Sequence, residues 1–68
     1  MILHSHTIGD FKANLYQYKL GYGYKIFTKI NNKNTCVDQS FVYFNDKIIC
    51  YDKMISALNM LMGMNELF

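Results

Sequence analysis

The residues best suited to bind a metal are two histidines near the amino terminus. In the opening MILHSH, His4 and His6 would point to the same side of an extended chain. Histidine is a common zinc ligand, but a zinc site needs at least three protein ligands. No cysteine or acidic residue stands beside this pair to supply a third. We therefore expect neither a metal site nor another cofactor.

The candidate nucleophiles lack surroundings that would activate them. Cys50 could pair with His4 or His6 as nucleophile and base, but it falls in a stretch expected in the core, where a thiol is inert. No serine lies in a glycine-rich elbow, and the acidic residues are scattered. The GYGYK segment at 21–25 precedes an expected strand rather than a helix, unlike a phosphate loop. The sequence therefore predicts a protein that is not an enzyme.

The stretch 40–52, SFVYFNDKIICYD, predicts a β-hairpin. Aromatic and β-branched side chains dominate it, and such residues favour strands. Asn45 and Asp46 tolerate the left-handed backbone angles of a tight turn. With the turn there, alternate residues sort onto two faces. One face would hold Phe41, Tyr43, Ile48 and Cys50, and the other Val42, Phe44, Ile49 and Tyr51.

Residues 7–20 fit two interpretations. As a helix, the segment would begin at Thr7 as N-cap and stop before Gly21, with Ile8, Phe11 and Leu15 along one stripe. As a strand, its tyrosines would alternate with polar residues. The helical pattern matches more of the segment, so we expect a helix here.

The rest of the chain predicts two further strands and a helix. Alternation indicates a strand over residues 22–30, and the polar NNKN at 31–34 turns the chain back into a second strand over 35–44. The third strand would be residues 47–51. Asp52 is a suitable N-cap for a last helix from 53 to about 67. Its apolar side would carry Met54, Ala57, Leu58, Leu61 and Met62.

These elements predict a single domain over residues 1–68 of the α+β class. We expect a small two-layer sandwich, in which a three-stranded antiparallel sheet has both helices on one face, in the order α-β-β-β-α. The opposite face of the first strand carries Lys25 and Lys29, which should stay in water. We therefore assign Ile26, Phe41, Tyr43, Ile48 and Cys50 to the buried face.

Composition narrows the class of protein. Hydrophobic residues make up 51% of the chain, which suffices for a folded core. We see neither a signal peptide nor an apolar run of about 20 residues, and two cysteines are too few for a disulfide framework. We therefore expect a cytoplasmic protein with reduced thiols and no membrane association. The bias towards Asn, Ile, Lys, Tyr and Phe suits AT-rich codons, as in a phage or a low-GC bacterium.

The face left uncovered would carry an apolar patch with lysines around it. Its expected residues are Lys25, Phe27, Lys29, Val42, Phe44, Lys47, Ile49 and Tyr51. A contiguous apolar patch usually marks an interaction site. We expect a non-catalytic protein-binding module, such as a phage or mobile-element inhibitor or modulator of a host protein, that binds this host target or itself as a homodimer. Cover by the amino-terminal segment is a further interpretation of the patch.

The alternative is a nucleic-acid-binding protein. Exposed aromatic rings on a sheet can stack on bases while neighbouring lysines meet phosphates. All seven basic residues are lysines, and the lack of arginine weakens this alternative because arginine is preferred for bidentate phosphate contacts.

Overall fold

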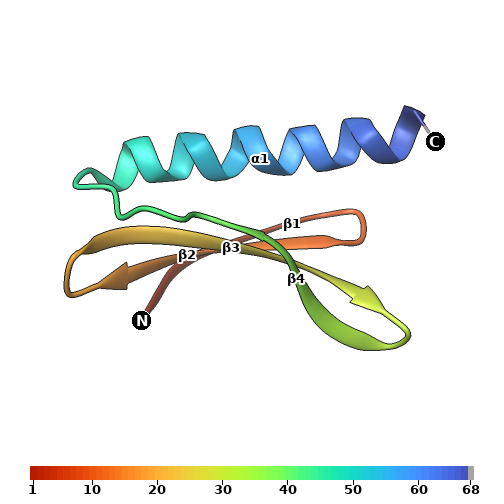
Figure 1. Ribbon diagram of the computed structural model, residues 1–68, viewed down its shortest axis with the longest axis horizontal. Helices are drawn as coiled ribbons and strands as arrows, with labels where there is room; N and C mark the ends of the chain where they lie inside the picture. The colour runs from red at the N-terminus through yellow and green to blue at the C-terminus, as the bar shows by residue number, and fades with distance from the viewer. Residues whose placement is uncertain (68) are drawn as a thin grey trace.

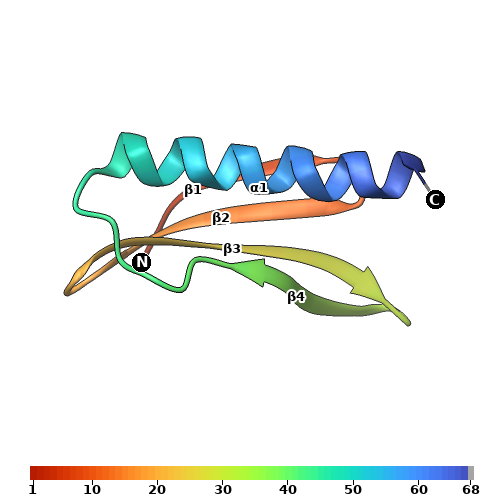
Figure 2. The ribbon, with the colours of Figure 1, turned by 45° about the horizontal axis from the view of Figure 1, so that its top comes forward.

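The computed structural model describes the backbone of residues 1–67 and the side chains of residues 1–63. The chain forms four antiparallel strands followed by a helix: β1 (Ile2–Ile8), β2 (Phe11–Tyr18), β3 (Gly21–Ile30), β4 (Lys33–Gln39) and α1 (Lys47–Leu67). The strand order is β1-β2-β3-β4, so each strand pairs with its neighbour in the sequence. Figure 1 shows α1 lying across one face of the sheet, and Figure 2 shows it running along β2 and β3.

This arrangement confirms the predicted small α+β fold with an antiparallel sheet, but the predicted α-β-β-β-α order is wrong. Two strands, β1 and β2, precede β3 where the first helix was predicted, and the third predicted strand belongs to α1, so the sheet has four strands rather than three. The strand predicted over 22–30 is found as β3, and the chain turns back after it as predicted. The turn is shorter than the predicted 31–34, however, because Lys33 and Asn34 already belong to β4, and the second strand, predicted over 35–44, spans Lys33–Gln39. Asn31 and Asn32 both have positive φ angles, of 52° and 65°, which suit a two-residue hairpin turn.

The helix predicted over residues 7–20 is absent. These residues are the end of β1, a turn at Gly9 and Asp10, and β2. Apolar residues such as Phe11 and Leu15 satisfy a period of two as well as a helical stripe, so the local pattern does not separate the two structures. Strand pairing explains why the segment is extended rather than helical, because β2 is hydrogen-bonded to β1 on one side and to β3 on the other.

The hairpin predicted over residues 40–52 is also absent. β4 ends at Gln39, and residues 40–46 form an irregular connection tied to β3. In this tie the amides of Tyr22 and Phe44 each donate to the other's carbonyl, at 2.8 and 2.9 Å. The predicted strand over 47–51 is instead the first part of α1.

Asp46 is the N-cap of α1 rather than a hairpin-turn residue. Its carboxylate accepts a hydrogen bond from the Ile48 amide at 2.8 Å. The predicted cap, Asp52, therefore lies inside the helix. The β-forming residues at 48–51 become helical because Cys50 continues the buried spacing of Met54 and Leu58, four residues apart on one helix face.

The core lies between α1 and the two middle strands. Its buried hydrophobic residues are Phe11, Ala13, Leu15, Ile26, Cys50, Met54 and Leu58. Ile26 and Cys50 are thus buried as predicted, and the predicted apolar side of the last helix packs here, with Ala57, Leu61 and Met62 partly buried. The assignment of Phe41, Tyr43 and Ile48 to the buried face is wrong, because all three are exposed.

Candidate binding surface on the open face of the sheet

The sheet face opposite α1 has no second layer over it in the part of the chain that the structure describes (Figure 1). Leu15 and Ile26 point towards α1, so alternate positions on the same strands point away from it. We call this surface the open face. Its strand residues include Ile2, Ser5, Thr7, Lys12, Asn14, Tyr16, Tyr18, Gly23, Lys25, Phe27, Lys29, Asn34, Cys36 and Gln39.

The strand register places Phe27 among three lysines. Lys12 on β2 is directly opposite Phe27 on β3, and side chains opposite one another have Cβ atoms about 4.5–5.5 Å apart. Lys25 and Lys29 lie two positions before and after Phe27 on the same strand and face, about 7 Å away along the chain. The strand register therefore places three lysine residues around Phe27.

The open face is hollowed beside this ring. The hollow has a volume of about 790 Å³ and is open to solvent. It is lined by Thr7, Gly9, Asp10, Phe11, Lys12, Asn14, Phe27, Thr28, Lys29 and Asn34. One wall is held in place where the Thr28 hydroxyl donates to the Asp10 carbonyl at 2.9 Å. The volume is in the range of roughly 300–1,000 Å³ typical of ligand sites.

Asn14 forms a fixed polar floor to this hollow. It is only 7% exposed. The Ser5 hydroxyl donates to its Oδ1 at 2.7 Å, and its Nδ2 donates to the Tyr16 hydroxyl oxygen at 3.2 Å. The ammonium group of Lys25 lies 5.6 Å from the centre of the Tyr16 ring, within reach of a cation–π attraction. The polar and aromatic groups of the open face are thus linked to one another.

The other end of the molecule is apolar. The Tyr18 ring lies 5.8 Å from Tyr16 and 5.4 Å, edge-on, from Tyr43 of the connection. Beside Tyr43, Phe41 is 86% exposed and Val42 is 62% exposed. Figure 1 shows this connection, the β2–β3 turn and the start of α1 at the same end. We call this surface the apolar end, and its exposed residues are Tyr18, Leu20, Phe41, Val42, Tyr43, Ile48 and Ile49.

The residues predicted to form one patch are divided between these surfaces. Lys25, Phe27 and Lys29 share the open face as predicted. The remaining ones are not on the sheet: Val42 and Phe44 lie in the connection, and Lys47, Ile49 and Tyr51 on α1. The sheet face predicted for these five residues is wrong, because residues 40–46 are an irregular connection and the segment from Lys47 is helical.

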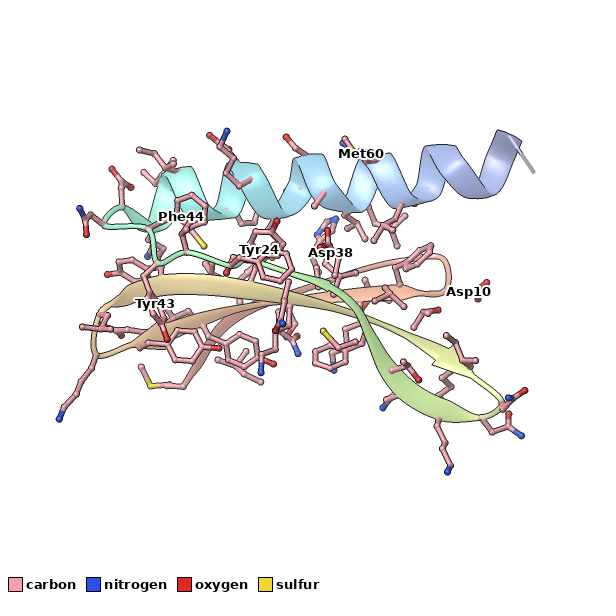
Figure 3. The ribbon with its side chains drawn as sticks, in the orientation of Figure 1. Asp10, Tyr24, Asp38, Tyr43, Phe44 and Met60 are labelled. Atoms are coloured by element: carbon pink, nitrogen blue, oxygen red, sulfur yellow. The ribbon has the colours of Figure 1, made fainter. Side chains whose placement is uncertain are left out.

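Two of the residues that lie off the sheet pack against the core. Phe44 and Tyr51 are half-buried against it, and the Tyr51 ring lies edge-on to His4 at 5.3 Å. Figure 3 shows Phe44 near the start of α1 and Tyr43 on the side of the open face.

The patch predicted from the sequence did not include Lys12, Tyr16 or Tyr18, which belong to the open face. They lie on β2, which the helical interpretation of residues 7–20 had removed from the sheet. The signal was the strand alternative for that segment, in which Tyr16 and Tyr18 alternate with Gln17 and Lys19.

Burial disfavours the ionised form of two titratable groups between the sheet and α1, Cys50 and Tyr24. Cys50 is fully buried, and burial raises the pKa of its thiol, which disfavours the nucleophilic thiolate. Burial, and then the nearby Asp38 and Cys50, raise the pKa of Tyr24. Figure 3 shows Tyr24 and Asp38 on the side of the sheet that faces α1.

The histidine pair has no further metal ligand near it in the described region. The rings of His4 and His6 are stacked 6.4 Å apart. Within the residues that the structure describes, no three or more His, Cys, Asp or Glu side chains gather as a metal site would require. In the same region, no helix has the length and hydrophobicity needed to cross a membrane.

Comparisons of this chain with models of known protein families, with curated proteins and with solved structures found no match. Function must therefore be inferred from the chemistry of the two surfaces.

Proposed function

We propose that the protein is a non-catalytic binding module that docks another protein against its apolar end. The observation that carries this proposal is the exposure of Phe41 and Val42, adjacent in the chain and both largely in water. Among the residues described, exposed large hydrophobic side chains outnumber buried ones. Neighbouring apolar side chains such as these are costly to leave in water and often mark a protein interface.

The apolar end also has the anatomy of a protein interface. Aromatic side chains at its centre are the type enriched in binding hot spots. Lys25 lines a hollow of about 280 Å³ with Phe41, Val42 and Tyr43, and Lys47 is exposed at the start of α1. An apolar centre with a charged rim suits a folded protein surface better than a polyanion.

The connection presents these side chains from a fixed backbone. The Ser40 amide donates to the Tyr24 carbonyl at 2.9 Å, and the Ser40 hydroxyl accepts from the Tyr24 amide at 3.0 Å. At the other end of the segment, Phe44 is bridged to Tyr22. Because both ends are tied to β3, little ordering should be required when a partner binds.

A binding module of this size acts by occupying a surface of its target. The composition favours amino acids that have AT-rich codons. Such a composition fits an inhibitor or modulator that a phage or other mobile element directs at a host protein. A second copy of this chain is the competing occupant of the apolar end, and the experiment below separates the two.

The test is affinity capture with a matched pair of variants. Wild-type protein, Phe41→Ser and Ile30→Ser are immobilised and exposed to nuclease-treated lysate of a low-GC bacterium, and retained proteins are quantified by mass spectrometry. Ile30 is 49% exposed at the β3–β4 turn, away from the apolar end, so it controls for lost hydrophobicity. Circular dichroism checks that each variant stays folded.

We expect one host protein to be retained by wild type and by Ile30→Ser, and at least about tenfold less by Phe41→Ser, as for an aromatic hot spot. Equal retention by all three proteins would contradict the proposal. Recovery of the bait alone, together with a dimer in sedimentation that Phe41→Ser dissociates, would assign the apolar end to self-association instead.

A further inference from the structure

A second surface on the open face has a different chemistry from the apolar end. The hollow beside Phe27 lies between the β1–β2 turn and the β3–β4 hairpin, because its lining includes Gly9 and Asp10 from the first and Lys29 and Asn34 from the second. The apolar end is formed by the β2–β3 turn, the connection and the start of α1, at the other end of the molecule (Figure 1). Lys25 lies between the two surfaces and also lines the hollow next to Phe41, so the two surfaces are tested separately through substitutions at other residues.

The hollow is the positive part of the open face. Lys12 and Lys29 line it, and Lys25 borders it in the strand register. Asp10 is the acidic residue in the lining. The other described carboxylates are elsewhere: Asp38 is on the α1 side of the sheet (Figure 3), Asp46 caps α1, and Asp52 is on α1. The lining therefore has two lysines against one carboxylate, a balance that favours an anion.

The aromatic ring of Phe27 lines the same hollow as Lys12 and Lys29. Phe27 is half-buried, so part of its ring surface remains open within the hollow. A partner bearing only negative charge would gain nothing from that ring. A nucleotide combines a flat base, which stacks on aromatic side chains, with a phosphate that lysines attract.

The remaining polar lining suits the edge of a base. Asn14 lies on the floor, where its Oδ1 and Nδ2 are already hydrogen-bonded to Ser5 and Tyr16. Thr7 and Asn34 are exposed at the rim and can both donate and accept hydrogen bonds. Bases in a duplex are stacked and paired, so a ring at the bottom of a hollow is accessible only to an unpaired base.

We propose that this hollow binds single-stranded nucleic acid, with a base stacked on Phe27 and the flanking phosphates contacted by Lys12, Lys25 and Lys29. The site requires neither the apolar end nor a protein partner. An acidic protein surface is the competing ligand, and it would use the lysines without needing the ring.

The experiment measures binding of fluorescein-labelled oligothymidylate and oligouridylate by anisotropy over a series of salt concentrations. Lys12→Gln and Lys29→Gln remove charge from the hollow. The matched control is Lys53→Gln, which removes an exposed lysine from α1 on the other side of the sheet. Phe27→Leu removes the ring and keeps an apolar side chain. Phe41→Ser tests independence from the apolar end, and circular dichroism verifies each fold.

For wild type we expect the logarithm of the binding constant to fall with the logarithm of salt concentration, with a slope of about −2 for three phosphate contacts. Lys12→Gln and Lys29→Gln should each reduce the slope by about 0.7. Phe27→Leu should weaken binding by roughly five- to 150-fold with the slope unchanged, as for one lost stacking contact. Lys53→Gln and Phe41→Ser should bind as wild type, and duplex DNA should compete poorly.

Three results would overturn the proposal: no binding at low salt, equal losses in Lys53→Gln and Lys12→Gln, or equal binding of duplex and single strand. A smaller salt slope in Lys12→Gln and Lys29→Gln, with no effect of Phe27→Leu on binding, would also overturn the proposal. That result would indicate a surface that binds any polyanion without stacking a base. None of these results bears on capture of a protein by Phe41, so the two proposals can fail independently.

Discussion

Gly21 shows at the scale of one residue how tightly the connection is held to the sheet. Its φ angle is +139°, a conformation that favours glycine. A Cβ atom added here would lie 2.6 Å from the backbone oxygen of Phe44 and 3.4 Å from the Tyr43 Cβ. The close approach belongs to the bridge that positions Tyr43 beside the exposed Phe41 and Val42.

We therefore expect Gly21→Ala to lower the free energy of unfolding by about 1–3 kcal/mol, from backbone strain and displacement of Phe44. Gly63→Ala is the matched control. Gly63 lies in α1 with nothing within 4 Å of an added Cβ, so alanine there should raise stability by roughly 0.5–1 kcal/mol. Urea titration followed by circular dichroism measures both. Equal effects of the two variants would show that Gly21 is not held as described.

Some residues of the open face could be placed from the sequence, whereas others, and the exposure of the apolar end, could not. Lys25, Phe27 and Lys29 could be placed on one face because β3 is long and alternates regularly. Lys12 could not be placed beside Phe27, because that neighbour depends on pairing with another strand. The exposure of Phe41 was not predictable, since an aromatic residue in an apolar run normally indicates burial.

At the scale of elements, the start of α1 depends on Asp46. Its carboxylate satisfies the Ile48 amide, which would otherwise be one of the unpaired donors in the first turn. Asp46→Ala should lower the free energy of unfolding by about 0.5–2 kcal/mol. Asp52→Ala, inside the helix and exposed, should change it by less than about 0.5 kcal/mol.

Thermal and urea denaturation of these two variants measure the difference. A larger loss in Asp52→Ala than in Asp46→Ala would place the helix start near residue 53, as the sequence pattern had predicted. It would also restore strand structure to the residues just before that start, and with it the shared sheet face for Ile49 and Tyr51.

Both wrong elements arise from segments whose local pattern permits two structures. Residues 7–20 satisfy a helical stripe, yet Gly9 and Asp10 make a turn that allows two strands to pair. Residues 47–51 are good strand formers, yet they continue the buried helix face of Met54 and Leu58. In both cases long-range pairing or packing overrides local propensity. The polar NNKN segment had no comparable competitor, so the position of its turn was predicted correctly, although only Asn31 and Asn32 form it and Lys33 and Asn34 begin β4.

At the scale of the molecule, one helix covers a sheet that is wider than the helix. The contacts of α1 centre on β2 and β3, and several helix-facing positions of the edge strands are polar, such as His4 and His6 on β1 and Asp38 on β4. Part of the apolar surface therefore stays exposed, and it includes Phe41, Val42 and Tyr43 where β4 leads into α1. This geometry leaves the apolar end available to a partner.

The most direct test of the apolar end is photo-crosslinking from position 41. A benzophenone derivative of phenylalanine replaces Phe41 in one sample and Ile30 in another, and each protein is irradiated in nuclease-treated lysate of a low-GC bacterium. We predict one discrete adduct from position 41, containing a host protein, and none from position 30. The same adduct from both positions, adducts of the chain with itself alone, or none from position 41 would contradict the proposed docking of another protein at the apolar end.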